Sequence, residues 1–118
     1  MTQNYIGTKQ VLAWEQEKDG QPGYGIKYPD GYVSWCPKDV FEKSYLPMGN
    51  VEHLPAFQQR VIGENVQLQD KIEKLSNFVK SGGAKALSDE DADLLGKQLA
   101  FMVLYKTVLD IRESKFNA

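Results

Sequence analysis

Residue types that usually perform covalent chemistry are scarce in this 118-residue chain. It contains one cysteine, Cys36, and one histidine, His53, in separate segments and without an assignable acidic partner. A nucleophile needs an adjacent general base, and a structural zinc ion needs about four ligands. Cys36 is more simply a small apolar interior residue. The sequence therefore predicts no catalytic residue, no metal ion and no cofactor, and we expect a binding protein that is not an enzyme.

Groups that bind anions are easier to find, because the chain has only two arginines, Arg60 and Arg112, and both fall in helical stretches. In an antiparallel helix pair, Arg60 near the start of the first helix and Arg112 near the end of the second lie at the same pole. Two guanidinium groups there could hold a phosphate through paired hydrogen bonds. Solvated surface arginines are the alternative interpretation.

Polar residues also interrupt the apolar stripes of these helices. Asn65 interrupts the stripe of the first helix. Gln98 lies on a stripe of the second helix, and Arg112 extends that stripe. A polar residue in a helical seam commonly fixes register or oligomer order, and this is the role we favour for Asn65. For Gln98 and Arg112 a structural role and a ligand-binding role are both open.

Aromatic residues gather in the N-terminal part of the chain: Trp14, Tyr24, Tyr28, Tyr32 and Trp35. Such rings could stack on nucleobases or sugar rings. Aromatic residues in the short strands of a small sheet more often form its core. We favour the core interpretation for this group.

Two long helices are predicted over residues 54–116, and they position the candidate binding residues. The first has a stripe with 4-4-3-4-3-4 spacing, which is typical of one face of a helix. That stripe consists of Phe57, Val61, Asn65, Leu68, Ile72, Leu75 and Val79. A turn rich in small residues is predicted near residues 80–88. Ser88 is a suitable N-cap for the second helix, and the acids that follow it suit the positive end of a helix dipole.

The second helix is apolar over more than one face. Leu94, Phe101, Tyr105 and Val108 form one stripe. Leu95, Leu99, Met102 and Leu109 form another, which Leu104 and Ile111 extend. A single partner helix cannot cover both stripes. We therefore expect this helix to pack also on the N-terminal unit, on another protomer or on both, and we favour self-association because large exposed apolar patches are unusual on monomers.

Residues 1–48 predict a small antiparallel β-unit with a short helix. Three stretches near residues 11–14, 24–28 and 32–35 are rich in aromatic and β-branched residues, which favours strands. Pro29-Asp30-Gly31 predicts a tight turn between the second and third strands. Pro37 suits the start of a short helix. The predicted fold class is α+β, with the β-unit over residues 1–48 followed by a long antiparallel two-helix hairpin over residues 49–118 that packs in an oligomer.

The charge and the hydropathy of the chain limit the classes of partner that we expect. The net charge is -2, and the charges are evenly divided between the two halves. Because there is no basic half, we expect neither DNA nor RNA as a partner. The longest uncharged apolar run, residues 99–105, is too short to span a bilayer, and a signal peptide is not evident. We expect no membrane contact and a cytoplasmic location.

Two resemblances add a biological setting. The segments FQQRVIGENVQLQDKIEKLSNFVKS and DADLLGKQLAFMVLYKTVLDIRESKF resemble a family of small bacteriophage helical-hairpin proteins named after a crAss-like phage. That hairpin is similar to the one in phage sponges against Thoeris and CBASS immunity, which bind cyclic nucleotide messengers and withhold them from host effectors. The segments YIGTKQVLAW and GYGIKYPDGYVSWCPKDVFEKSY look like a recurrent phage module that precedes other anti-defence domains.

The resemblance also implies ligand-binding residues. In such a sponge the ligand contacts a phenylalanine that ends the first helix, an amide early in the second, and an arginine near its end. Phe78 and Arg112 match the first and third of these, and Gln98 is the nearest amide, one turn beyond the second. We add Arg60 and Tyr105 as further candidates.

The implied function is to bind and sequester a host cyclic nucleotide immune messenger, of cyclic oligonucleotide or cyclic ADP-ribose type, without cleaving it. The messenger would be buried between protomers of a homo-oligomer in the cytoplasm of the infected bacterium. The alternative is a phage adaptor or inhibitor whose extra helical face binds a host immune protein directly. An enzyme such as a phosphodiesterase is least favoured, since no paired base and nucleophile are present.

Overall fold

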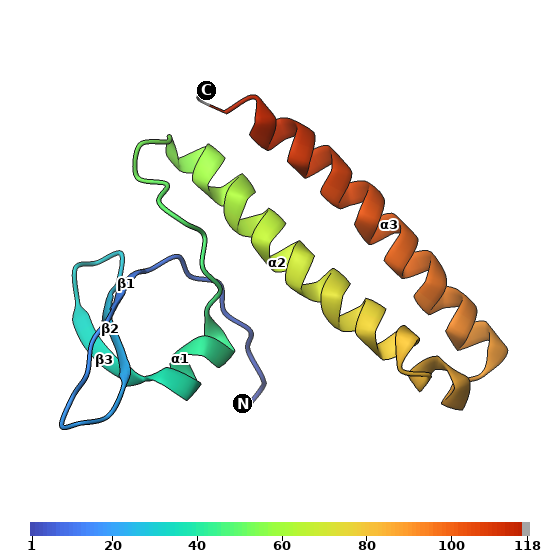
Figure 1. The fold of residues 1–118 in the computed structure, drawn as a ribbon, viewed down its shortest axis with the longest axis horizontal. Coiled ribbons are helices and arrows are strands. Elements are labelled where there is room, and N and C mark those ends of the chain that lie inside the picture. The colour runs from blue at the N-terminus through green and yellow to red at the C-terminus, as the bar shows by residue number, and fades with distance from the viewer. Residues whose placement is uncertain (117–118) are drawn as a thin grey trace. The chain divides into compact units, whose positions relative to one another are not determined.

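The structure, a computed structural model, describes residues 1–116. Its elements in chain order are β1 (Leu12–Glu15), β2 (Gly23–Lys27), β3 (Val33–Pro37), α1 (Lys38–Ser44), α2 (Ala56–Lys80), the short 3-10 helix η1 (Gly83–Ala86) and α3 (Asp89–Ser114) (Figure 1). The chain divides into two compact units, the first over Met1–Leu46 and the second beginning at Pro47. The predicted α+β class is confirmed, with an antiparallel sheet followed by a long helix pair.

The sheet has the order β1-β2-β3, and both strand pairs are antiparallel. β1 and β2 are joined by a hairpin whose tip has positive φ at Asp19 (51°) and Gly20 (79°). An Asp-Gly pair accepts this geometry readily, which makes it a common two-residue hairpin turn. Lys18 and Gln21 flank the tip and exchange two backbone hydrogen bonds of 2.9 Å. The connection between β1 and β2 is therefore an ordered hairpin end.

The predicted turn between β2 and β3 is confirmed. The backbone amide of Gly31 donates to the carbonyl of Tyr28 at 2.9 Å, and Gly31 has φ of 91°. The Asp30 carboxylate accepts a hydrogen bond of 2.9 Å from the backbone amide of Tyr32. Glycine at the position of positive φ and an aspartate that caps the turn explain why this sequence reverses the chain here.

The two faces of the sheet have different neighbours. α1 covers one face, where Phe41 is buried and its ring stacks on Tyr24 with 4.2 Å between centroids. Ile26, 3% exposed, completes the interior of this unit. On the other face the register sets Trp14 and Trp35 on either side of Gly25. Their indole rings lie over glycines of the central strand, which have no side chain to hold them away.

The aromatic residues therefore form the core only in part. Tyr24, Tyr28 and Trp35 are half-buried, in line with the core interpretation. Trp14 is 41% exposed and Tyr32 is 64% exposed, so the core interpretation is wrong for these two. The reason is that α1 covers a single face of the sheet, and Tyr32 follows the turn at its edge.

Position 23 in β2 has no room for a residue larger than glycine. A methyl group at this position would collide with the Trp35 ring and with the Cys36 carbonyl oxygen, which belongs to the paired backbone and cannot rotate away. We expect Gly23→Ala to destabilise the β-unit by about 1–3 kcal/mol. Denaturant unfolding followed by tryptophan fluorescence measures this, and Gly7→Ala, where a methyl group meets nothing within 4 Å, is the control. Equal stability of the two variants would contradict the prediction.

The core of the hairpin lies between α2 and α3. Val61, Leu68 and Leu109 are buried there, and Ile72, Met102 and Phe116 pack against them. The predicted stripe of α2 is confirmed over its middle part. Its ends differ from the prediction, since Phe57 is 54% exposed and Val79 is 38% exposed. Phe57 lies beyond the last turn of α3, so no turn of the partner helix stands opposite it.

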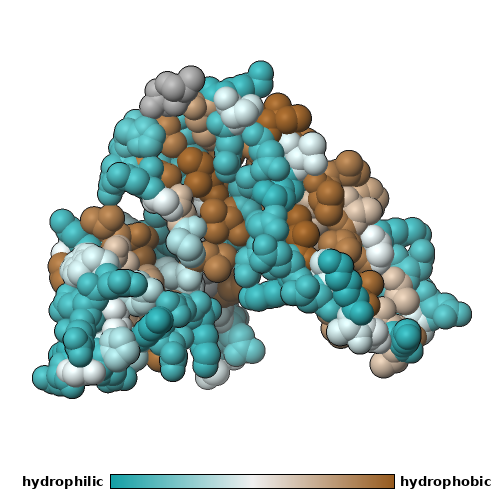
Figure 2. Space-filling model, viewed as in Figure 1, coloured by the Kyte–Doolittle hydropathy of each residue, from teal (hydrophilic) through white to brown (hydrophobic). Residues whose placement is uncertain are grey.

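The start of α3 and its two stripes follow the prediction. The Ser88 hydroxyl accepts a hydrogen bond of 3.1 Å from the Asp91 backbone amide, which confirms the N-cap. The stripe that contains Leu109 faces α2. The other stripe is uncovered, and its apolar members Leu94, Phe101, Tyr105 and Val108 are all exposed. Leu104 and Ile111, which were expected to extend the stripe with Leu109, are exposed too and belong to this uncovered side. Figure 2 shows hydrophobic side chains at the surface along the hairpin.

Neither α2 nor α3, the two helices of sufficient length among residues 1–116, is apolar enough to cross a membrane.

Candidate ligand-binding surface

Arg60 and Arg112 lie at the same pole of the hairpin, because α2 begins where α3 ends (Figure 1). Hydrogen bonds across the seam fix this alignment. The Asn65 amide nitrogen donates to Asp110 at 2.8 Å and to Glu113 at 3.0 Å. Both arginines are exposed, and neither forms an ion pair within residues 1–116. This pole therefore carries two guanidinium groups that are available to an anion.

Phe78 lies near the opposite end of α2. From Asn65 to Phe78 the helix advances by about 20 Å, at a rise of about 1.5 Å per residue. Its ring rests over Gly83 of η1, so closely that a methyl group on Gly83 would collide with it. A single hairpin thus separates Phe78 from Arg112 by more than three helical turns, roughly 20 Å. The two residues do not meet within one chain.

Gln98, Tyr105 and Arg112 form a row along one side of α3. They recur every seven residues, which is about two helical turns, so they share a side of the helix. All three side chains are exposed. The Gln98 amide nitrogen lies 3.9 Å from the Met102 sulfur, a weak contact that leaves the amide accessible. The row shares Tyr105 with the uncovered apolar stripe and offers an amide, a phenol ring and a guanidinium to a ligand.

Asn65 belongs to a polar cluster inside the seam. The Lys106 ammonium donates to the side-chain amide oxygen of Asn65 at 3.2 Å and forms an ion pair of 3.0 Å with Asp110. Asn65 is only 5% exposed, and its side chain donates and accepts within this cluster. These contacts support a role in fixing the alignment of α2 against α3. These partners were not predicted, although Lys106 and Glu113 continue the heptad spacing of Met102 and Leu109.

The same cluster predicts an acid-sensitive hairpin. The pKa of Asp110 is lowered from its ordinary value of 3.8, first by the Asn65 hydrogen bond and then by the Lys106 hydrogen bond. A carboxyl group with a depressed folded pKa adds stability above its unfolded pKa, and this stability is lost as the pH falls through the folded value. We expect Asp110→Asn to flatten the loss of stability below about pH 4. Chemical unfolding measured across this range tests it.

Glu64→Gln is the matched control for that measurement, because Glu64 is an exposed acid on the neighbouring helix. It should keep the acid-induced loss of stability. An unchanged pH dependence in Asp110→Asn would show that another group controls the acid response.

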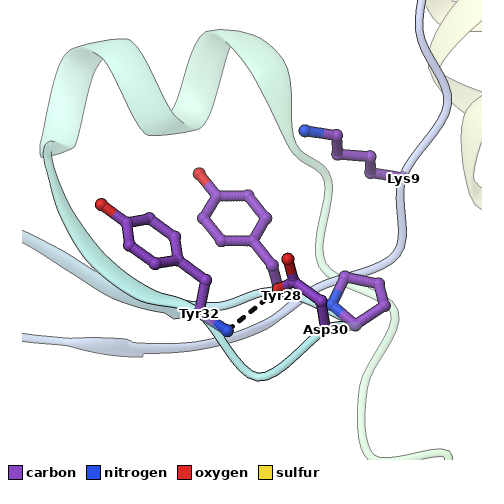
Figure 3. Close-up of a pocket in the computed structure, with 5 residues that line it drawn as sticks. Lys9, Tyr28, Asp30 and Tyr32 are labelled. Carbon is purple, nitrogen blue, oxygen red and sulfur yellow. Dashed lines mark hydrogen bonds between the residues drawn. The ribbon is translucent and has the colours of Figure 1, made fainter.

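A shallow depression also lies on the β-unit, lined by Lys9, Tyr28, Pro29, Asp30 and Tyr32 (Figure 3). The Lys9 ammonium is 5.0 Å from the centroid of the Tyr28 ring, and the Tyr28 and Tyr32 rings stack at 5.9 Å. Lys9 was not among the residues predicted to bind a ligand. Because Lys9 already covers one ring and the depression is wide open, it offers a weaker ligand site than the row on α3. Among the residues that the structure describes, no group of three or more His, Cys, Asp or Glu residues could hold a metal ion.

The hairpin matches a known protein family. Residues 55–115 match the Sequestin family, and this segment is just over half of the chain. The chain belongs to the Sequestin family. The matched segment contains α2, η1 and α3, and it includes all five candidate residues Arg60, Phe78, Gln98, Tyr105 and Arg112. No curated protein and no solved structure matches this chain.

The family indicates a sequestering function for this Sequestin, and hence a role in binding. The matched segment does not include the β-unit. The family match therefore concerns the hairpin alone.

Proposed function

We propose that this Sequestin binds a host cyclic nucleotide immune messenger, of cyclic oligonucleotide or cyclic ADP-ribose type, and withholds it without cleavage. The setting we propose is the cytoplasm of a phage-infected bacterium. The observation that carries the proposal is the row Gln98, Tyr105 and Arg112 on the exposed side of α3, inside the family segment. A cyclic nucleotide combines phosphate, sugar and a planar base, and this row offers a partner for the phosphate and for the base.

Each side chain has a distinct part in this binding. The planar guanidinium of Arg112 suits two parallel hydrogen bonds to a phosphate, and Arg60 at the same pole adds a second positive charge. The Tyr105 ring offers a stacking face, and the Gln98 amide can both donate and accept at a base edge. Phe78 supplies a second ring, 42% exposed.

A homo-oligomer is part of the proposal. Because Phe78 and Arg112 of one chain lie at opposite ends of the hairpin, a small ligand that touches both needs them from different copies. The uncovered apolar stripe of α3 supports this, since it shares Tyr105 with the row and would be covered by a second chain.

Calorimetry of the full chain against cyclic dinucleotides, cyclic trinucleotides and cyclic ADP-ribose isomers tests the proposal, with linear nucleotides as controls. We expect saturable binding of at least one cyclic messenger, and we expect that messenger to be recovered intact after the protein is denatured. If no cyclic nucleotide of the panel binds, and the protein does not protect the phage in infected cells, the proposed sequestration of cyclic messengers is overturned. Recovery of a cleaved product would instead show an enzyme.

The same uncovered stripe also supports the alternative of an adaptor that binds a host immune protein. A pull-down from host lysate separates the two functions. A sponge retains a small nucleotide that can be extracted by heat, whereas an adaptor retains one defined polypeptide at equal stoichiometry and no nucleotide.

A further inference from the structure

α3 carries a second heptad stripe, distinct from the one that faces α2. Its positions alternate steps of four and three along the helix: Glu90, Leu94, Lys97, Phe101, Leu104, Val108, Ile111 and Lys115. The five apolar members are between 54% and 67% exposed. This spacing is that of a coiled-coil seam, in which each residue inserts between residues of a facing helix. The stripe therefore has the geometry of an interface that nothing covers within the hairpin.

The stripe is self-complementary when it is reversed. An antiparallel copy related by a two-fold axis between Phe101 and Leu104 sets Phe101 opposite the partner's Leu104. The same axis sets Leu94 opposite the partner's Ile111. In a two-fold interface each contact occurs twice, so both halves of the stripe are covered at once. Lys97 faces an apolar position, and its long side chain can reach solvent beside Asp93, with which it forms an ion pair of 2.8 Å.

The charges at the two ends select this orientation. The antiparallel register sets Glu90 opposite the partner's Lys115 at both ends of the seam. A parallel register would set Glu90 against a second Glu90 and Lys115 against a second Lys115, which is repulsive. Neither Glu90 nor Lys115 forms an ion pair in the part of the chain that the structure describes. Their charges are thus available to set the orientation of the second copy.

We propose that this stripe of α3 is the surface on which two copies of the chain pair, antiparallel and about a two-fold axis between Phe101 and Leu104. The apolar members supply the buried area, and the opposite charges at the ends supply the register. The molecule that covers the stripe is a second copy of this chain, because the stripe complements its own reversed sequence in both spacing and charge.

The pairing has a consequence for the ligand site, which rests on the proposed function. Arg112 lies one turn before Lys115, so in the pair it approaches the end of the partner hairpin where α3 begins. Phe78 lies near that same end, because α2 finishes where α3 starts. Along the helix axis, the pair thus sets Arg112 of one copy at the same end as the partner's Phe78, whereas within one hairpin the two residues lie at opposite ends.

Light scattering coupled to size-exclusion chromatography tests the interface without any ligand. Leu104→Asp places a charge in the stripe, and we expect it to reduce the mass to that of the monomer. Val103→Asp is the matched control, since Val103 is the neighbouring residue, is 48% exposed and belongs to neither stripe. We expect it to keep the wild-type mass. A wild-type chain that is monomeric at high concentration, or an equal effect of the two substitutions, would overturn the proposal.

A charge exchange tests the orientation. Glu90→Lys and Lys115→Glu should each weaken self-association by at least about tenfold, because each creates a like-charge pair at both ends. The double variant should associate as the wild type does. Failure of the double variant to recover, with helical content unchanged by circular dichroism, would exclude the antiparallel register. Because mass is measured without messenger, this outcome is independent of whether the proposed function holds.

Discussion

Leu109→Ala is expected to destabilise the hairpin by about 3–4 kcal/mol, which is the largest effect on stability that we expect from a single side chain. Leu109 is 1% exposed and packs with Val61 and Leu68 at the centre of the seam. Truncation removes buried apolar area and leaves a cavity, because two long helices held along their whole length cannot collapse locally around it. An effect of this size is a large fraction of the stability of a small domain.

Urea unfolding followed by circular dichroism measures this loss. Val103→Ala is the control, because Val103 is on the same helix but exposed, and it should change the stability by less than about 0.5 kcal/mol. Both variants are compared at equal protomer concentration, since any self-association makes stability depend on concentration. A cost below about 1 kcal/mol for Leu109→Ala would show that the seam is not the core of the folded hairpin.

Arg112→Ala should weaken messenger binding by about 30-fold to 150-fold, the largest effect expected on function. A charge-assisted hydrogen bond contributes about 2–3 kcal/mol, and about 1.4 kcal/mol corresponds to a tenfold change in affinity. Arg112→Lys keeps the charge but loses the planar fork, so its affinity should fall between those of the wild type and the alanine variant. Calorimetry with the messenger found in the panel gives the three dissociation constants.

Lys74→Ala is the matched control for the loss of one positive charge. Lys74 is an exposed cation on α2 whose ion pair with Asp70 spans one helical turn at 2.9 Å. Such exposed pairs contribute little, so messenger affinity and stability should both stay near the wild type. Equal binding by the wild type and Arg112→Ala would show that Arg112 does not contact the messenger. An equal loss in Lys74→Ala would show that only net charge matters.

Most of the fold follows from local sequence patterns. Aromatic and β-branched stretches mark the three strands, Pro37 precedes α1, and Ser88 caps α3 as predicted. The hairpin tip at Asp19-Gly20 was missed, although that dipeptide is itself a turn signal. The aromatic core was overestimated, because alternation along a strand does not say whether a helix covers one face or both.

The candidate site was less accessible to sequence reasoning. Gln98, Tyr105 and Arg112 could be placed on one side of a helix from their spacing alone. Their distance from Phe78 could not, because it depends on how far α2 extends alongside α3. The partners of Asn65 were missed for the same reason, since its hydrogen bonds reach Asp110 and Glu113 across 45 and 48 residues of sequence.

By itself the sequence determined the α+β class, the two long helices and the two apolar stripes of α3, because propensities, caps and periodicity act within a few residues along the chain. The tertiary structure decided which stripe of α3 is buried and which stays open. It also fixed the separation of Phe78 from Arg112 along the hairpin at roughly 20 Å. The physical reason is that the polar cluster of Asn65, Lys106, Asp110 and Glu113 sets the alignment of the two helices through contacts between residues remote in sequence.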